Sequence, residues 1–157
     1  MEKGISLYWA KWLRPDPRTE PTETKASGFY MTSDINKNKA HDKGFDDALM
    51  KDFGGYIAEC TAANIFLVIK REVYTSDPYC FLDGITRQTI IDIVKQKNYK
   101  VHVRNIWPDE LNEADEVFKT GTAAEITAVG KIENKNYRVG PITKDLKDAY
   151  VKLIMGI

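Results

Sequence analysis

The stretch Asn64–Lys70, NIFLVIK, decides the fold class, because its unbroken apolar run predicts a strand buried in the core. The next segment, Glu72–Thr75, predicts a short strand that pairs back against it. On the N-terminal side, the strands expected at Asp47–Lys51 and Tyr56–Glu59 flank Gly54-Gly55, which is a signal for a hairpin. The centre of the chain is therefore expected to be a sheet.

Helices and further strands surround this centre without the regular alternation of strand and helix that a parallel α/β sheet requires. We therefore predict an α+β fold with one or two mixed sheets and the helices outside. The further strands are expected at Ile5–Leu13, Tyr99–Ile106, Glu116–Thr120 and Ile126–Ile132. A turn is expected at Asn134–Asn136, and helices are expected from Thr22 or Thr24 to about Lys43, from Gly84 to about Lys97, and at Pro108–Ala114 and Pro141–Met155.

The composition excludes several classes of protein. The chain has 157 residues, 43% of them apolar, which suits one folded domain with a real core. The 23 basic residues equal the 23 acidic residues, and this balance argues against a main role in binding nucleic acid or an anionic membrane. No stretch is long and apolar enough to cross a bilayer.

The cysteines and histidines predict neither a disulfide framework nor a metal site. Cys60 and Cys80 are the two cysteines, and His41 and His102 lie far apart in unrelated surroundings. The first residues lack the apolar core of a signal peptide, so a reducing cytoplasm is the compartment we expect.

One lysine lies among small residues in Pro21–Tyr30, PTETKASGFY. Lys25 has room for a ligand to reach its amine, and a lysine amine can form an imine with an aldehyde. Tyr30, five positions later, could donate a hydrogen bond to a ligand oxygen. The alternatives are a surface lysine and a half-buried core tyrosine, which are the commoner uses of these residue types.

A carboxylate lies among small and apolar residues in Ile57–Phe66, at Glu59. A buried carboxylate needs a partner, and a protonated pyridine nitrogen would serve. The alternative is a carboxylate at the end of a strand, paired with a basic side chain or with solvent.

Two short segments are suited to bind anions. Gly84-Ile85-Thr86 opens a helix, where free backbone amides and a nearby hydroxyl can bind phosphate. Gly121-Thr122-Ala123-Ala124 follows a strand, and its small residues let amides approach an anion. Ordinary turns and caps remain the alternatives. With Lys25 and Glu59, these segments describe a site for a phosphorylated aldehyde with a ring nitrogen, which is pyridoxal phosphate.

At these residues the chain resembles the branched-chain aminotransferase group of the class IV (fold type IV) pyridoxal-phosphate enzymes. The matching segments, in the family's order and spacing, are PTETKASGFY, GYIAECTAANIF, FLDGITRQTIID, ADEVFKTGTAAEITAV and VGPITKDL. The resemblance implies a mixed-sheet pseudobarrel with flanking helices, with residues 1–157 forming the single cofactor-binding C-terminal domain. It also implies that the family's smaller N-terminal domain, which provides a phosphate-binding arginine and part of the substrate pocket, is absent.

The resemblance also implies roles for individual residues. Lys25 is similar to the lysine that forms the Schiff base and later moves the proton between Cα and C4′. Tyr30 matches the tyrosine that bonds the cofactor's 3′-oxygen, and Glu59 matches the acid that pairs with the pyridine nitrogen. The phosphate contacts are implied at Ile85, Thr86 and Thr122, and the substrate carboxylate is implied to meet the amides of Thr122 and Ala123.

The implied activity is transamination between a branched-chain amino acid and 2-oxoglutarate, in a homodimer or with the missing N-terminal domain as partner. The alternatives are an inactive fragment, half of a split enzyme, a D-amino-acid aminotransferase or an aminodeoxychorismate lyase. The segment Cys60–Ala63 departs from the glycine-rich segment with a glutamate that family members often carry, and this departure could alter the pocket wall.

Overall fold

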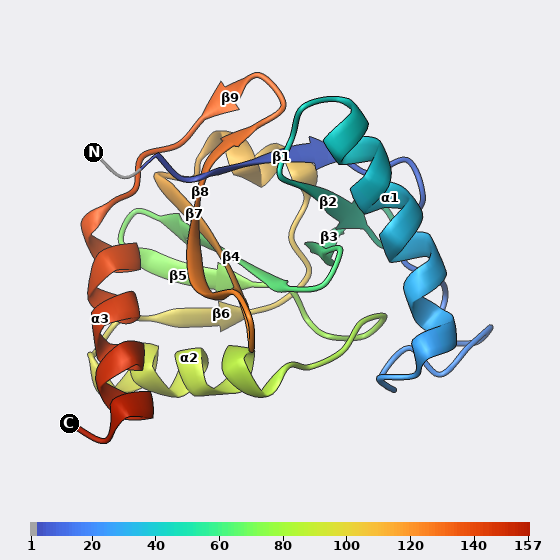
Figure 1. Cartoon of the computed structure of the whole chain (residues 1–157). Helices are drawn as coiled ribbons and strands as arrows, with labels where there is room; N and C mark the ends of the chain where they lie inside the picture. Colours follow the sequence, from blue (N-terminus) through green and yellow to red (C-terminus); the bar gives the residue numbers. More distant parts are fainter. Residues whose placement is uncertain (1–2) are drawn as a thin grey trace.

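The computed structural model describes residues 3–157, and within that range it contains nine strands and three α-helices (Figure 1). The strands are β1 (Ile5–Trp9), β2 (Asp47–Lys51), β3 (Ile57–Cys60), β4 (Asn64–Ile69), β5 (Glu72–Thr75), β6 (Val101–Val103), β7 (Glu116–Gly121), β8 (Glu125–Ile132) and β9 (Lys135–Asn136). The helices are α1 (Tyr30–Asp42), α2 (Ile85–Gln96) and α3 (Pro141–Met155), with 3₁₀ turns η1 (Ser27–Phe29) and η2 (Pro108–Asn112).

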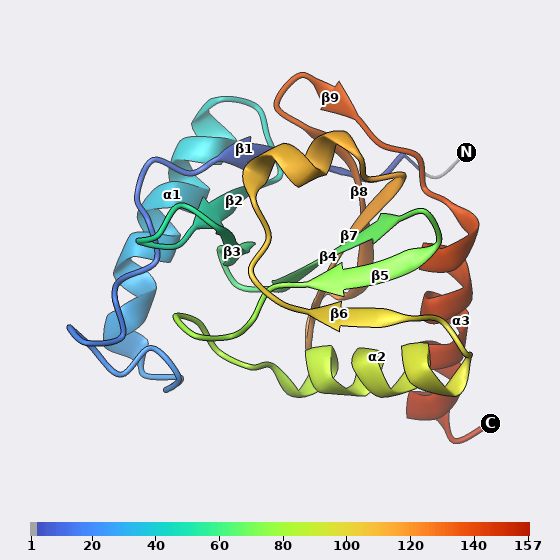
Figure 2. The same cartoon turned by 180° about the vertical axis from the view of Figure 1, so that it is seen from behind.

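Six of the strands close into a ring, in the order β3-β2-β1-β8-β7-β4 and back to β3. The closing contact is the antiparallel pairing of Glu59 in β3 with Asn64 in β4. Strands β5 and β6 extend the sheet from β4, and β9 pairs with β8 (Figure 2). The ring mixes parallel and antiparallel neighbours, since β1 runs parallel to both β2 and β8. This arrangement confirms the predicted α+β pseudobarrel.

The strand β4 is buried on both faces, which explains its apolar run. Ile65, Leu67 and Ile69 belong to the core inside the ring, to which all six ring strands contribute. Phe66 and Val68 belong to a second core beneath the helices, where the Phe66 ring stacks on Phe118 at 4.9 Å between centroids. Because side chains alternate across a strand, only a fully apolar sequence suits a strand between two cores.

The helices cover the ring from two sides (Figure 1). The helices α2 and α3 pack against each other and over the second core, through side chains such as Ile90 and Leu146. On the opposite side α1 packs on β1 and β2, where Ala40 meets Met50. None of the helices within residues 3–157 is long and apolar enough to cross a membrane.

The boundaries of several predicted elements were wrong. The helix expected from Thr22 or Thr24 begins only at Tyr30, because the Thr24 hydroxyl donates to the Pro21 carbonyl (2.9 Å) and caps no helix. The first strand ends at Trp9 and not at Leu13, and the Trp12 carbonyl accepts a hydrogen bond from the Asn36 side chain (2.8 Å) in place of a strand partner.

Two further boundaries differ because of how the neighbouring strands pair. The predicted strand Tyr99–Ile106 is reduced to β6, whose parallel partner β5 is itself only four residues long. Residues 134–136, expected as a turn, include β9, which pairs with the end of β8.

A buried carboxylate anchors the first turn of α3. Glu116 in β7 is 1% exposed, and its two oxygens accept hydrogen bonds from the amides of Ile142 (3.3 Å) and Thr143 (2.7 Å). The carboxylate thus satisfies two of the amides that a helix leaves free at its N-terminus. The helix packs close to it at Gly140, where an added Cβ would lie 2.1 Å from Glu116 Oε1.

We predict that Glu116→Ala lowers the free energy of unfolding by about 2 kcal/mol, because two buried amides lose their acceptor. Gly140→Ala should also destabilise, since its methyl group would overlap the carboxylate. The double variant should lose less than the sum of the two, because Glu116→Ala makes room for the methyl group. Urea denaturation of the four proteins measures this coupling, and strictly additive losses would contradict it.

Candidate functional site

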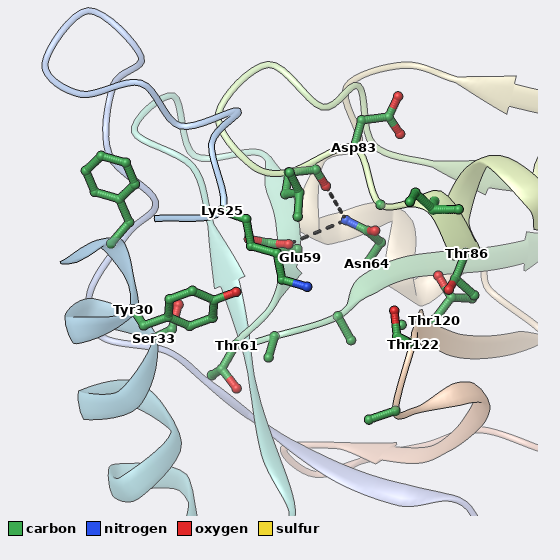
Figure 3. Close-up of a pocket in the computed structure, with 18 of the residues that line it drawn as sticks. Lys25, Tyr30, Ser33, Glu59, Thr61, Asn64, Asp83, Thr86, Thr120 and Thr122 are labelled. Carbon is green, nitrogen blue, oxygen red and sulfur yellow. Dashed lines mark hydrogen bonds between the residues drawn. The ribbon is translucent and has the colours of Figure 1, made fainter. Parts of the chain in front are cut away.

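A cavity of about 470 Å³ lies at one end of the ring (Figure 3). Four parts of the chain surround it: the segment before α1, the β3–β4 turn, the start of α2 and the β7–β8 turn. The site residues expected from the sequence all line this cavity, and they are Lys25, Tyr30, Glu59, Ile85, Thr86, Thr122 and Ala123. The fold thus brings together residues that lie up to about a hundred positions apart in the sequence.

Lys25 and Tyr30 reach the cavity from the segment that leads into α1. Lys25 lies in an irregular stretch just before η1, and its side chain is exposed to solvent. Tyr30 is the first residue of α1 and is half-buried. In Figure 3 the Lys25 amine and the Tyr30 hydroxyl both point into the cavity. The irregular backbone therefore leaves the lysine amine accessible to a ligand.

Glu59 is a buried carboxylate at the inner edge of the cavity and is 8% exposed. One oxygen lies 3.4 Å from Arg14 Nε, and the other accepts a hydrogen bond of 3.4 Å from Asn64 Nδ2. Burial raises the pKa of Glu59 to about 8, although the Arg14 charge opposes this effect and the Asp47 charge adds to it. The carboxylate is thus incompletely compensated by the protein around it.

Sequence reasoning missed Arg14 and Asn64, the two partners of this carboxylate. Arg14 is 7% exposed, and its Nε also lies 3.2 Å from the Cys80 carbonyl. Asn64 also donates to the Leu82 carbonyl (3.0 Å), and so ties β4 to the segment before α2. A polar residue opening an apolar run is a signal that could have found Asn64. Arg14 carries no comparable signal, because it lies between a strand and two prolines, far from Glu59 in sequence.

The start of α2 presents its first amides to the cavity without a side-chain cap. Gly84 is the N-cap residue, and a Cβ there would lie 2.5 Å from Asn64 Oδ1, so the helix approaches β4 closely only with glycine at this position. Arg87 in the first turn is buried, and it bonds the Asp83 carboxylate and the Ser76 carbonyl (2.9 Å). These contacts fix the direction in which the helix meets the cavity.

The β7–β8 turn contributes Thr120, Gly121, Thr122 and Ala123. Thr122 and Ala123 are exposed, whereas Thr120 is completely buried. The hydroxyl of Thr120 has no hydrogen-bond partner among the described residues. Figure 3 places Thr120 and Thr122 beside Thr86, so that three threonines from two segments, the β7–β8 connection and the start of α2, gather at this side of the cavity.

The cavity wall at Thr61 is held by a buried ion pair. The Thr61 hydroxyl donates to Asp47 Oδ1 (2.6 Å), and Lys119 Nζ lies 2.7 Å from Asp47 Oδ2. The hydroxyl of Thr61 therefore points away from Lys25, as Figure 3 shows. Three residues of the segment that departs from the family pattern line this wall, namely Thr61, Ala62 and Ala63.

The cavity therefore combines three kinds of group: an accessible amine, a buried carboxylate, and a cluster of amides and hydroxyls. An amine can form an imine with a carbonyl compound. A buried carboxylate favours a cation, and free amides at a helix start favour an anion. The arrangement suits a ligand that is cationic at one end and anionic at the other.

Comparison with known proteins gives a consistent assignment. The family model described as Amino-transferase class IV matches residues 1–132. The probable branched-chain-amino-acid aminotransferase of Rickettsia bellii is 38% identical over 98% of this chain and 54% of its own length.

Two solved structures have the same fold. The branched-chain amino acid aminotransferase from Escherichia coli has a TM-score of 0.94 and 34% identity, covering 99% of this chain and 54% of its own. An aminotransferase from Brucella abortus bound to the cofactor PLP has a TM-score of 0.92 and 30% identity, covering 98% of this chain and 55% of its own.

The chain spans about half the length of the curated relatives it matches. Within that half the similarity is continuous, because the family model and the matched structures both extend over the ring and the cavity. On the sequence match and the shared fold together, the chain belongs to the class IV aminotransferase family.

Proposed function

We propose that this chain is the pyridoxal-phosphate-binding domain of an enzyme that transfers the amino group between a branched-chain amino acid and 2-oxoglutarate. The observation that carries the proposal is the convergence of Lys25, Glu59 and the threonine cluster on one cavity, in a chain of this family. The branched-chain substrates are proposed from the relatives, two of which have names that specify branched-chain aminotransferases.

The residues around the cavity fit pyridoxal phosphate. Its pyridine ring, when protonated, is a cation that would compensate the Glu59 carboxylate, whose buried charge is unfavourable enough without ligand to raise the pKa of Glu59 to about 8. Its phosphate is an anion that suits the uncapped start of α2 and the threonines beside it. The Lys25 amine reaches the cavity from a different segment, where it can meet the aldehyde of the ligand.

When bound, pyridoxal phosphate supplies an aldehyde for imine formation and a ring that accepts electrons as the bond to the substrate Cα breaks. The task of Glu59 is to hold a proton on the ring nitrogen, because a carboxylate in a buried site favours a cation at its oxygens. Asn64 and Arg14 position that carboxylate from either side.

Lys25 is the general base and acid in this proposal. Its Nζ would take the proton from the substrate Cα and deliver it to the C4′ carbon of the cofactor, which requires an amine that can move once it is released from the ligand. Lys25 lies in an irregular segment and is exposed, so its side chain has that freedom. Tyr30 orients the ring by donating a hydrogen bond from its hydroxyl to the 3′-oxygen.

The phosphate is held by Ile85, Thr86 and Thr122, the first two through the start of α2. The amides of Thr122 and Ala123 receive the substrate carboxylate. Both residues are exposed on the β7–β8 turn, where a substrate can reach them.

Two partners are proposed: a second copy of the chain, as in a homodimer, or a further domain equivalent to the other half of the relatives' length. The alternative functions expected from the sequence, a D-amino-acid aminotransferase or an aminodeoxychorismate lyase, would use the same cofactor residues. Assay of L-leucine against D-amino acids and aminodeoxychorismate, with the partner present, distinguishes them.

We predict that pyridoxal phosphate binds weakly to this chain alone, because Lys25 is open to water, and that the bond it forms is at Lys25. Titration with the cofactor, followed by visible absorbance, measures binding. Borohydride reduction and peptide mapping then locate the label.

Lys25→Ala should abolish the mapped label, whereas Lys37→Arg, a change at an exposed lysine of α1, should leave it. Label on other lysines with Lys25 unlabelled would contradict the site. Tight binding with steady transamination of leucine by the chain alone would contradict the need for a partner.

We predict that Glu59 makes the ligand-free protein less stable as the pH rises from about 4.5 to about 8. In this window the folded state keeps the Glu59 proton, whereas the unfolded state has already lost it. Raising the pH therefore favours unfolding until the folded carboxyl also ionises. Glu59→Gln removes this penalty, so its free energy of unfolding relative to the unsubstituted protein should rise with pH and level off above about 8.

Urea denaturation at several pH values measures this difference, with Glu113→Gln, a change at an exposed carboxylate, as the matched control. The free energy of unfolding of the control should change with pH in parallel with that of the unsubstituted protein. When pyridoxal phosphate is added at high pH, the higher free energy of unfolding of Glu59→Gln should disappear. The glutamine of the variant cannot pair with the ring cation, whereas the Glu59 carboxylate of the unsubstituted protein can. Parallel pH profiles for Glu59→Gln and the unsubstituted protein would disprove the buried-carboxylate argument.

A further inference from the structure

Thr120 is the one threonine of the cavity cluster that has no role of its own in the proposed function. It lies at the end of β7, where its backbone pairs with Asn64 in β4 and with Ile126 in β8. Its side chain is completely buried and lines the cavity, yet its hydroxyl has no hydrogen-bond partner among residues 3–157. A buried hydroxyl without a partner destabilises a protein, and valine would fill the same volume without that disadvantage.

The side chains around Thr120 are already engaged or unable to serve. The Asn64 amide nitrogen bonds the Leu82 carbonyl and Glu59, and its oxygen lies against Gly84. The nearest hydroxyls in the cavity are those of Thr86 and Thr122, which lie on the same side (Figure 3). None of these groups bonds the Thr120 hydroxyl, which leaves it free to bond what the cavity holds.

We propose that Thr120 is an additional binding residue for the phosphoryl group of the cofactor, to which it donates a hydrogen bond from Oγ1. This inference rests on the proposed function and extends it. It makes the anion site a cluster of three hydroxyls from two segments, the β7–β8 connection and the uncapped start of α2. A phosphoryl group has enough oxygens to accept from all three hydroxyls and from the helix amides together.

The test compares pyridoxal 5′-phosphate with pyridoxal, which lacks the phosphoryl group. Thr120→Val should weaken the binding of pyridoxal 5′-phosphate by about tenfold to a hundredfold, the effect of losing a hydrogen bond to a charged group. The same variant should bind pyridoxal as the unsubstituted chain does. Thr120→Ser keeps the hydroxyl and should remain within about threefold of the unsubstituted chain for both aldehydes.

Thr143→Val is the matched control, since Thr143 in α3 carries the other buried hydroxyl without a partner among the described residues and does not line this cavity. It should bind both aldehydes normally. Without ligand, both valine variants should unfold at the same temperature as the unsubstituted protein or higher, because each removes an unpaired hydroxyl. Pyridoxal 5′-phosphate should then raise the unfolding temperature of Thr120→Val less than that of Thr143→Val.

The outcomes separate the two proposals. If the unsubstituted chain prefers pyridoxal 5′-phosphate to pyridoxal and Thr120→Val keeps that preference, the role of Thr120 is wrong and the proposed function stands. Equal losses for both aldehydes would show general damage and would also overturn the role. If the unsubstituted chain binds neither aldehyde, the proposed function fails and the inference fails with it.

Discussion

The pairing of Glu59 with Asn64 closes the ring of six strands, and the candidate site depends on that closure. The two residues face each other across the β3–β4 turn, so the contact that completes the barrel also places a carboxylate and an amide at the edge of the cavity. Asn64 then reaches the Leu82 carbonyl and fixes the segment that leads into α2. The same short turn closes the sheet and positions the start of a helix, so the contacts that complete the fold also build the candidate site.

Several polar groups in the cavity make the ligand-free protein less stable than apolar side chains in their place would. Glu59 is buried with a raised pKa despite the nearby Arg14, and the Thr120 hydroxyl is unpaired within the described part of the chain. Each of these two groups lowers the stability of the ligand-free protein. Packing elsewhere compensates for this loss, as in β4, which is buried on both faces. Unsatisfied groups gathered in one cavity indicate binding, since a ligand with matching charges removes both penalties together.

The sequence predicted what depends on local pattern and missed what depends on contacts across the fold. The apolar run of β4, the glycine before α2 and the bounds of α3 were read correctly because each leaves a signal within a few residues. The residues expected in the cavity were found through several short segments that match a family. Arg14 was missed because its partner Glu59 lies far away in the sequence, and the late start of α1 was missed because Thr24 bonds Pro21 and not a helix amide.

The same distinction applies to the wall beside Lys25. From sequence, the Cys60–Ala63 segment was expected only to be able to alter the pocket wall, and the direction of its side chains was unknown. In the folded chain Asp47 accepts a hydrogen bond from the Thr61 hydroxyl, while Lys119 neutralises Asp47 from β7. The wall therefore presents the Thr61 methyl group with Ala62 and Ala63. The Thr61 hydroxyl is directed toward the buried ion pair of Asp47 and Lys119. A wall of small residues whose one hydroxyl is bonded to Asp47 is largely apolar, which suits the hydrocarbon side chain of the substrate proposed for this site.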